Sequence, residues 1–472
     1  MPIPSPVITQ QKRKHHRFSL VLAGLLCMFP LSLQAALQEQ KILSLQECIR
    51  IALENSSAVR QAEHSVRLQG SDVLKSYGQF LPKVSASAAY VPSSVSKTYA
   101  DPSAATVAET STESVDLSLT TSLNIFNGFR DYAALQAAMK RRDAAELSLS
   151  RARQAIAYDV TQSYFRVLLD RELLKIASEN LSSSRDRLLL TKRQYEIGLK
   201  PVTDYYQQQA ETATNELDVI RAENALRGSR LELLRRLRLN PAEEIDAADV
   251  AEDSLLRLPR TIDRDSIVSR GLANRKDLQS AERSTLAAKW EVTRAEGQRY
   301  PSLDLSFVLA TGGYPYYSLN TPGTGETVYD YPPLREQLSD LAGYSLRLTM
   351  NWTIFDGFLT RYGVEQARIN YLNEGLNAGD LEHDIAIDIN IAADNYTAAF
   401  KQIETSRQGL RAAGKAFETV NRKYDLGAAS FVEANAARAA LVAAKADYAQ
   451  AVYNLALQKN VLDFTTGTTT IE

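Results

Sequence analysis

The sequence predicts an α+β fold class in which long α-helices predominate, with four β-strands per chain and an internally duplicated unit. Three observations predict it. The phrase IFNGF at 125–129 returns as IFDGF at 354–358. Two segments of about 65 residues keep apolar side chains at helical spacing, and four segments of about ten residues alternate apolar and polar side chains.

The duplication is tested by shifting the chain along itself. A shift of 219 aligns the residues before the first strands, and a shift of 229 aligns everything that follows the second strands, so one loop differs in length. The aligned pairs include Leu53 with Leu272, Asn55 with Asn274, Pro82 with Pro301, Phe126 with Phe355, Tyr195 with Tyr424 and Gly198 with Gly427.

These shifts define the predicted domains. The first repeat is 37–240, the second repeat is 262–463, an acidic connector at 241–261 separates them as an equatorial region, and 464–472 is a C-terminal tail. Two copies are too few for a solenoid, which needs at least about three.

Residues 1–36 are predicted to be a cleaved signal peptide. A basic stretch at 12–17 precedes a short apolar run at 18–33, and small residues for cleavage follow at Ala35 and Ala36. The alternative is an N-terminal membrane anchor, for which the apolar run is short. We therefore expect an exported protein, which is soluble or crosses a membrane as strands.

Each repeat is expected to hold the same elements in order. The first begins with a helix at 44–80, with Ser44 as N-cap and Pro82 as its stop. Strands at 83–92 and 114–126 follow, with a Ser/Thr/Ala/Pro loop between them, then a long helix at 130–194 and a return helix at 202–238. Gly198 is placed in the turn between the two helices, as a left-handed residue that ends the first.

The second repeat has the corresponding strands at 302–310 and 344–355, separated by a Tyr-rich loop at 312–333. Its long helix is predicted at 361–423, its turn at Gly427 and its return helix at 431–462. At about 1.5 Å per residue each long helix would measure roughly 100 Å, well beyond a usual globular length. A coiled-coil rod is the other interpretation of these helices.

The strands alternate apolar residues with Ser, Thr, Asp or Arg and end in aromatic residues, which is typical of outer-membrane barrels. A half-buried strand of a soluble sandwich would alternate too. Four strands cannot close a barrel, and an open edge cannot face lipid. If these strands lie in a membrane, several copies must pool them, and the helices would continue the same hollow wall as a conduit.

Composition and charge argue against other functions. The net charge of −2 offers no field for nucleic acid. Beyond the signal peptide, the sequence has one cysteine, Cys48, and two histidines, His64 and His383. None of the three is spaced from another as the ligands of a metal site would be. GTGET at 323–327 lacks the Lys of a phosphate loop. We expect no enzyme, no cofactor and no metal.

The duplication, the helix–Pro–strand junctions, the F-[ND]-G-F phrase and the Y-x-x-G turns together resemble the TolC family of outer-membrane efflux and secretion channels. The resemblance covers essentially the whole mature chain. It implies a homotrimer with a twelve-stranded β-barrel in outer-membrane lipid and an α-helical barrel, or periplasmic tunnel, that extends into the periplasm. It also implies two partners, a periplasmic adaptor (membrane fusion protein) and an inner-membrane pump.

The resemblance also implies sites. Strand–helix junctions fall on Phe126, Gly128, Phe129, Phe355, Gly357 and Phe358, and adaptor-docking turns fall on Tyr195, Gly198, Leu199, Tyr424, Gly427 and Ala428. A periplasmic gate falls on Thr203, Asp204, Tyr424 and Glu433. Ala429 stands where the family has an arginine of its closing contacts, and Ala436 stands where it has a second aspartate. Glu433 is either part of an acidic ring or an acid that stabilises its helix N-terminus.

The expected function is passive passage from periplasm to exterior for substrates that the pump and adaptor deliver, most of all small-molecule or drug efflux. Type I secretion of polypeptides is the alternative within the same architecture. A periplasmic coiled-coil structural or adaptor protein is the alternative from a different class. The sequence leaves the cargo, the pump, the adaptor and the role of the Tyr-rich loop open.

Overall fold

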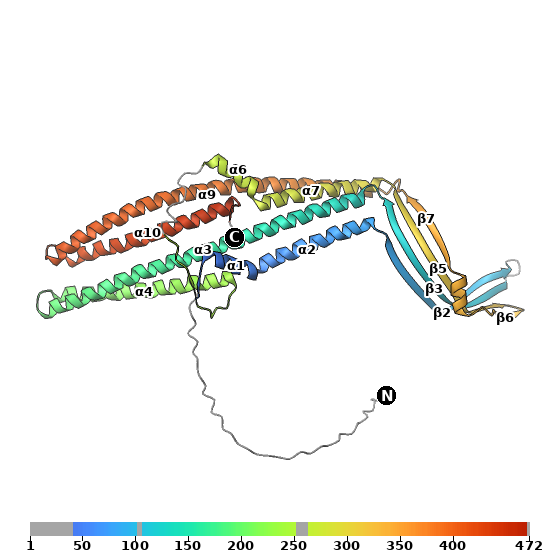
Figure 1. The fold of residues 1–472 in the computed structure, drawn as a ribbon, viewed down its shortest axis with the longest axis horizontal. Coiled ribbons are helices and arrows are strands. Elements are labelled where there is room, and N and C mark those ends of the chain that lie inside the picture. Colours follow the sequence, from blue (N-terminus) through green and yellow to red (C-terminus); the bar gives the residue numbers. More distant parts are fainter. Residues whose placement is uncertain (1–40, 102–105, 252–262, 470–472) are drawn as a thin grey trace, which may run out of the picture. The chain divides into compact units, whose positions relative to one another are not determined.

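The computed structural model describes residues 41–101, 106–251 and 263–469. These belong to one compact unit, Gln40–Glu472 (Figure 1). The predicted signal peptide lies outside the described residues, as do part of the predicted connector and the end of the C-terminal tail.

The first half of the chain contains two short helices, two long strands and two long helices. Their order is β1 (Lys41–Leu43), α1 (Leu45–Asn55), α2 (Ser57–Tyr77), η1 (Gly78–Phe80), β2 (Lys83–Asp101), β3 (Thr106–Phe126), α3 (Arg130–Glu196), α4 (Val202–Leu237) and β4 (Ile245–Ala247).

The second half has the same plan. Its elements are α6 (Arg264–Asn274), α7 (Lys276–Glu296), η2 (Gly297–Arg299), β5 (Ser302–Thr321), β6 (Gly325–Val328), α8 (Leu334–Asp340), β7 (Gly343–Asn351), α9 (Leu359–Asp425) and α10 (Phe431–Thr465). α3 and α9 each have 67 residues, and their first residues differ by the 229 positions found in the sequence. This agreement in order and length is what a duplicated unit predicts.

Local sequence explains where the first helices begin and end. Ser44 caps α1 through a capping box with Glu47, as the N-cap prediction required. The predicted single helix at 44–80 is wrong in one respect, because it breaks at Ser56, which caps α2 through a hydrogen bond from the backbone N–H of Val59. A serine that can bond its own backbone favours such a break.

Three of the four predicted strands are longer than predicted, whereas the strand predicted at 344–355 is shorter, because β7 ends at Asn351 together with its pairing to Ser302. β2 and β3 pair in antiparallel register from Lys83 opposite Ser122 to Asp101 opposite Thr106, so most of the predicted Ser/Thr/Ala/Pro loop is strand. The Tyr-rich segment is likewise structured, because β5 runs to Thr321 and turns back into β6. Gln337 of α8 joins this segment, accepting from the Tyr314 amide at 2.8 Å and donating to the Pro332 carbonyl at 2.7 Å.

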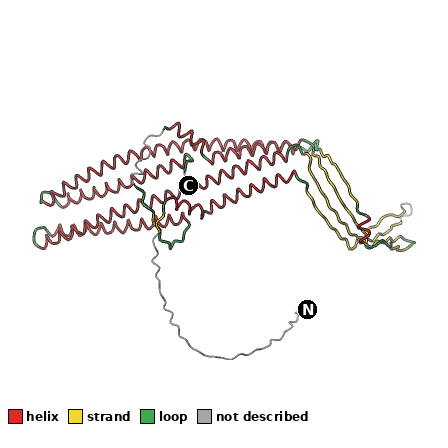
Figure 2. The backbone as a smooth tube through the Cα atoms, viewed as in Figure 1, coloured by secondary structure: helices red, strands yellow, loops and turns green. Residues whose placement is uncertain are grey.

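The large sheet has the order β2-β3-β5-β6, and β7 also pairs with β5 (Figure 2). β3 and β5 join the two halves through pairs from Glu109 opposite Asn320 to Phe126 opposite Leu303. Apart from this sheet, β1 and β4 form a parallel pair that brings the start of the described chain beside the connector.

The helices pack around α3, which contacts α2, α4, α7 and α10, whereas α9 contacts α7 and α10. The main apolar cluster includes Leu43, Val160, Leu233 and Val452, and so joins β1, α3, α4 and α10. Tyr164 is buried within it and donates a hydrogen bond to the Ala248 carbonyl at 2.8 Å. A buried phenol with a backbone partner fixes the connector onto α3.

Candidate functional site

The large sheet has one apolar face and one polar face. Directly opposite residues of antiparallel strands lie on the same face, so Ala86, Leu119, Leu309 and Tyr344 form one row across the sheet. Most of this face is exposed, and Leu348 of β7 keeps 60% of its surface accessible. The other exposed apolar residues of this face include Val84, Tyr90, Leu117, Phe307, Leu346 and Met350.

The opposite face carries hydroxyls, amides and carboxylates. The Ser87 and Ser118 hydroxyl oxygens lie 2.7 Å apart, and Asn124 donates to Asp304 at 2.7 Å. An apolar face open to the surroundings and a polar face behind it form the pattern of a strand between lipid and water.

The sheet ends in unpaired backbone on both sides. Within the described residues, β2 pairs only with β3, and β7 pairs only with β5. Unpaired N–H and C=O groups on an edge strand readily accept another strand. In lipid they must be satisfied by pairing.

The two strand–helix junctions have the same geometry. Gly128 and Phe129 adopt left-handed backbone at φ 69° and 63°, and Gly357 and Phe358 do so at 66° and 71°. The ring centroids of Phe126 and Phe129 lie 5.5 Å apart in an edge-on arrangement, and those of Phe355 and Phe358 repeat this distance and arrangement. The structure therefore brings the predicted junction residues together within each repeat.

The junctions differ in what surrounds them. A Cβ on Gly128 would lie 2.3 Å from the Gly297 carbonyl oxygen, so the backbones of η2 and the α3 junction are in close contact. The residue that corresponds to Gly297 in the first repeat is Gly78, and Gly357 and Gly78 each have no atom within 4 Å of such a Cβ. The contact between Gly128 and Gly297 is thus made within one chain. Gly357 and Gly78, which would make the corresponding second contact, each lie without such a neighbour.

Both hairpin tips contain the predicted glycine turn. Gly198 and Gly427 have φ of 80° and 76°. In the first turn the Leu199 amide donates to the Gln194 carbonyl at 2.8 Å, and in the second the Ala428 amide donates to the Lys423 carbonyl at 2.7 Å. This is the Schellman arrangement that ends a helix, and it leaves Leu199 and Leu426 largely exposed.

Two of the four predicted gate residues, Asp204 and Tyr424, are joined within the chain through a third residue. In the described part of the chain Tyr424 forms no hydrogen bond with Thr203 or Asp204. The side chain of Lys200 lies between them, with Nζ 4.1 Å from the centroid of the Tyr424 ring and 3.9 Å from Oδ2 of Asp204. The sequence did not single out Lys200, which the shift of 229 pairs with the uncharged Ala429.

Glu433 forms a capping box with Ser430, whose backbone amide donates to its carboxylate at 2.8 Å. This hydrogen bond and one from the Ser430 hydroxyl hold the pKa of Glu433 below its ordinary value. Within the single chain, Glu433 therefore acts as an acid that stabilises the N-terminus of α10.

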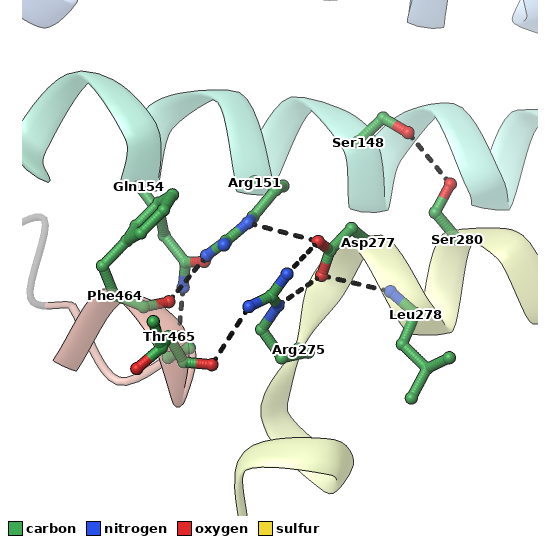
Figure 3. A network of polar contacts seen from close by, with 10 residues as sticks. Ser148, Arg151, Gln154, Arg275, Asp277, Leu278, Ser280, Phe464 and Thr465 are labelled. Atoms are coloured by element: carbon green, nitrogen blue, oxygen red, sulfur yellow. Dashed lines mark hydrogen bonds and ion pairs between the residues drawn. The ribbon is translucent and has the colours of Figure 1, made fainter. Parts of the chain in front are cut away.

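A polar clamp, defined as Arg151, Arg275 and Asp277, holds the end of α10 against α3 and α7 (Figure 3). Arg275 is buried, donates to the Asp277 carboxylate at 2.8 and 2.6 Å, and donates to the Thr465 carbonyl at 3.1 Å. Arg151 donates to the Phe464 carbonyl at 2.9 Å and lies over the Phe464 ring. Both arginines therefore bind the carbonyls at a helix C-terminus, where cations are favoured.

Charge and burial compete within the clamp. Burial alone would raise the pKa of Asp277, but the hydrogen bond from Arg275 and the charges of both arginines outweigh it, so the pKa is lowered. Burial, with the charge of Arg275, lowers the pKa of Arg151 to about 10. The stabilisation from Asp277 is present above its unfolded pKa of about 4 and is lost as the pH falls through the lowered folded value.

Replacing Arg275 with methionine is expected to destabilise the folded protein by about 3–5 kcal/mol, because it leaves the half-buried Asp277 carboxylate with one partner fewer and removes the donor to the Thr465 carbonyl. The measurement is the midpoint of thermal unfolding at neutral pH. Arg264→Met is the matched control, since Arg264 pairs with Asp394 at an exposed site and such pairs contribute about 0–1 kcal/mol. Equal shifts for the two variants would contradict the clamp.

The family follows from a comparison with known sequences. A family model described as outer membrane efflux protein matches residues 48–237 and 267–468. The chain belongs to this family. The resemblance inferred from the repeated motifs is thereby confirmed, and so is the predicted outer-membrane localisation, because the matched family is one of outer-membrane proteins.

Curated relatives of this outer membrane efflux protein support the same conclusion. TolC of Escherichia coli is 21% identical over 355 residues, which cover 75% of this chain and 69% of TolC. The pyoverdine export outer membrane protein OpmQ of Pseudomonas aeruginosa is 28% identical over 195 residues, which cover 40% of each chain. These relatives are outer-membrane proteins and not enzymes.

Solved structures share the fold of this outer membrane efflux protein. The CmeC outer membrane channel of Campylobacter jejuni matches with a TM-score of 0.74 at 17% identity, over 90% of this chain and 85% of CmeC. CusC matches with a TM-score of 0.75 at 18% identity, over 91% and 93%. The predicted fold class, in which long helices predominate beside an antiparallel sheet, is confirmed.

None of the helices among the described residues is both long and apolar enough to cross a membrane. No group of three or more His, Cys, Asp or Glu side chains in the part of the chain that the structure describes is placed to hold a metal ion.

Proposed function

We propose that this outer membrane efflux protein is the outer-membrane channel of a tripartite export system. It gives passive passage to substrates that an inner-membrane pump and a periplasmic adaptor deliver. The observation that carries the proposal is the large sheet, whose apolar face is exposed and whose two edges are unpaired. Such a sheet belongs in lipid only as part of a closed wall.

The proposed assembly is a homotrimer in which β7 of one copy pairs with β2 of the next. Three copies of β2, β3, β5 and β7 give a twelve-stranded barrel. A closed barrel has no edge strand. The junctions support this assembly, because Gly357 and Gly78 each present half of the contact that Gly128 and Gly297 complete within the chain. In a ring of copies, Gly357 of one copy would contact Gly78 of the next, as Gly128 contacts Gly297 within the chain.

The two hairpin tips are the proposed docking site of the adaptor. Tyr195, Gly198 and Leu199 form one tip, and Tyr424, Gly427 and Ala428 form the other. Leu199 is 72% exposed and Leu426 is 84% exposed. Exposed leucines at the end of a polar hairpin are suited to a helical partner that covers them. The proposed gate lies just beside these tips, at Thr203, Asp204, Tyr424 and Glu433.

The proposed cargo is small molecules, including drugs. The name of the relative OpmQ describes export of pyoverdine, a small molecule, and this supports the choice. Secretion of polypeptides by a type I system is the second candidate, because a passive wall of this architecture makes few demands on its cargo.

The test is to delete the protein from its host and to measure two outcomes together. Small-molecule efflux predicts greater susceptibility to toxic compounds and their accumulation in the cell, with an unchanged set of secreted proteins. The loss of a secreted polypeptide with unchanged susceptibility would establish the second candidate. Complementation with the wild-type chain, in a strain that lacks related channels, controls for redundancy.

A further inference from the structure

The two helical hairpins of one chain, α3–α4 and α9–α10, are held together differently along their length. Near the connector they share apolar clusters, whose outermost members are Leu174, Leu226, Ile403 and Tyr448. Among the described residues, none between 175 and 225 or between 404 and 447 belongs to an apolar cluster. At about 1.5 Å per residue, roughly 30 Å of each hairpin extends beyond its shared core.

Polar contacts join the hairpins over this distal part. Arg187 of α3 bonds Asn421 and lies 5.6 Å from the centroid of the Phe417 ring. From the other hairpin, Arg438 bonds Ser183, and Lys445 lies 3.4 Å from Glu179. The pair of Lys445 and Glu179 is exposed and individually weak, whereas Arg438 is buried. The hairpins therefore separate most readily beyond Arg438, toward the tips.

Lys200 is the last of these contacts before the tips. It lies in the turn between α3 and α4, and its side chain keeps only 23% of its surface accessible. Its ammonium group contacts the face of Tyr424, in the last turn of α9, and at the same time faces the carboxylate of Asp204. An ammonium within about 6 Å of a ring centroid is attracted by the ring, and Asp204 orients it.

The corresponding residues of the second hairpin cannot make the same contact. Lys200 corresponds to Ala429, which has no charge, and Asp204 corresponds to Glu433. Glu433 is bound by Ser430, whereas Pro201 stands at the corresponding place in the first hairpin and offers no hydroxyl or N–H. The Asp204 carboxylate is therefore available to Lys200. The first hairpin supplies the cation and the second supplies the ring, and no corresponding contact is made with these roles exchanged.

We propose that Lys200 is the positioning residue that ties the two hairpin tips of one subunit and sets their separation. This inference rests on the proposed channel function, in which the tips surround the periplasmic opening. Loss of the tie lets the tips of one subunit part and widens that opening, without affecting the trimer or its barrel.

The test measures the distance between the tips in the assembled protein. Spin labels are attached at Ile197→Cys and Leu426→Cys, both exposed turn positions, and labelled chains are diluted with unlabelled ones so that one copy per trimer reports. Lys200→Met removes the charge and keeps the stem, Lys200→Arg retains a cation, and Tyr424→Leu removes the ring. Lys192→Met is the control, since Lys192 pairs only within its helix, with Glu196.

We expect Lys200→Met to raise the ratio of separated to joined tips about fivefold, as the loss of one cation–π contact predicts. Tyr424→Leu should do the same, and the double variant should add little, because both remove one contact. Lys200→Arg should restore the wild-type distances, and Lys192→Met should leave them unchanged. Channel conductance in planar bilayers should rise in parallel with the separated fraction.

Wild-type distances in Lys200→Met would overturn the inference. If the assembled protein conducts no ions in any variant, the proposed channel function is overturned. The measured distances between the tips would still show whether Lys200 holds them together.

Discussion

Replacing Gly128 with alanine is expected to destabilise the folded chain by about 2–5 kcal/mol. The left-handed backbone of this residue costs a non-glycine side chain about 1–2 kcal/mol. In addition, the new Cβ would lie 2.3 Å from the Gly297 carbonyl oxygen, and relief of such an overlap costs about 1–3 kcal/mol. The measurement is the midpoint of thermal unfolding of the purified protein.

Two matched glycines separate these contributions. Gly198→Ala places the same substitution at φ 80° with no atom within 4 Å, so it measures the backbone cost alone. Gly228→Ala, inside α4 and also in open space, should be neutral or stabilising by up to about 1 kcal/mol. If Gly128→Ala and Gly198→Ala lower the stability equally, the contact with Gly297 is not important.

A disulfide between two copies is the second large expected effect. In the chain, Ser122 of β3 pairs with Ser306 of β5. Applying the shifts of 229 and 219 to this pair gives Asn351 of β7 and Ser87 of β2. We expect Ser87→Cys with Asn351→Cys to give covalently closed trimers on non-reducing gels, because paired Cβ atoms lie about 4.5–5.5 Å apart, close to what a disulfide spans.

The controls use the same sheet. Ser122→Cys with Ser306→Cys should form a disulfide within one chain and leave its mass unchanged. Ser85→Cys with Asn351→Cys shifts the pair by two residues on the same face and should link poorly. The native Cys48 should not interfere, because burial raises the pKa of its thiol to about 12 and so removes the reactive thiolate. Cross-linked products no larger than dimers would contradict the proposed trimer.

Repetition made much of this fold predictable. Gly198 and Gly427 identified both hairpin turns, because a left-handed residue after a long periodic helix favours glycine. The long helices contain no proline, and their apolar periodicity continues through the glycines of α9, so their predicted ends lie within about two residues of the observed ones, the usual uncertainty of a helix boundary.

Other features depended on partners that are distant in the sequence. The Ser/Thr-rich segment before Thr106 resembled a loop by composition, but it forms strand because β3 offers a continuous partner. The contact of Lys200 with Tyr424 joins residues that are far apart in the chain, and no local pattern marks it. The open half-contacts at Gly78 and Gly357 required coordinates, because they depend on which atoms are near.

The length of the strands has a consequence for the cell. About 9–11 tilted residues suffice to cross a bilayer, and β7 has 9, whereas β2 and β3 have 19 and 21. Roughly ten residues at the paired ends of β2 and β3 therefore extend beyond the lipid, as a two-stranded ribbon rich in Ser and Thr. Antibodies and cell-impermeant labels should therefore reach this part of the chain on intact bacteria.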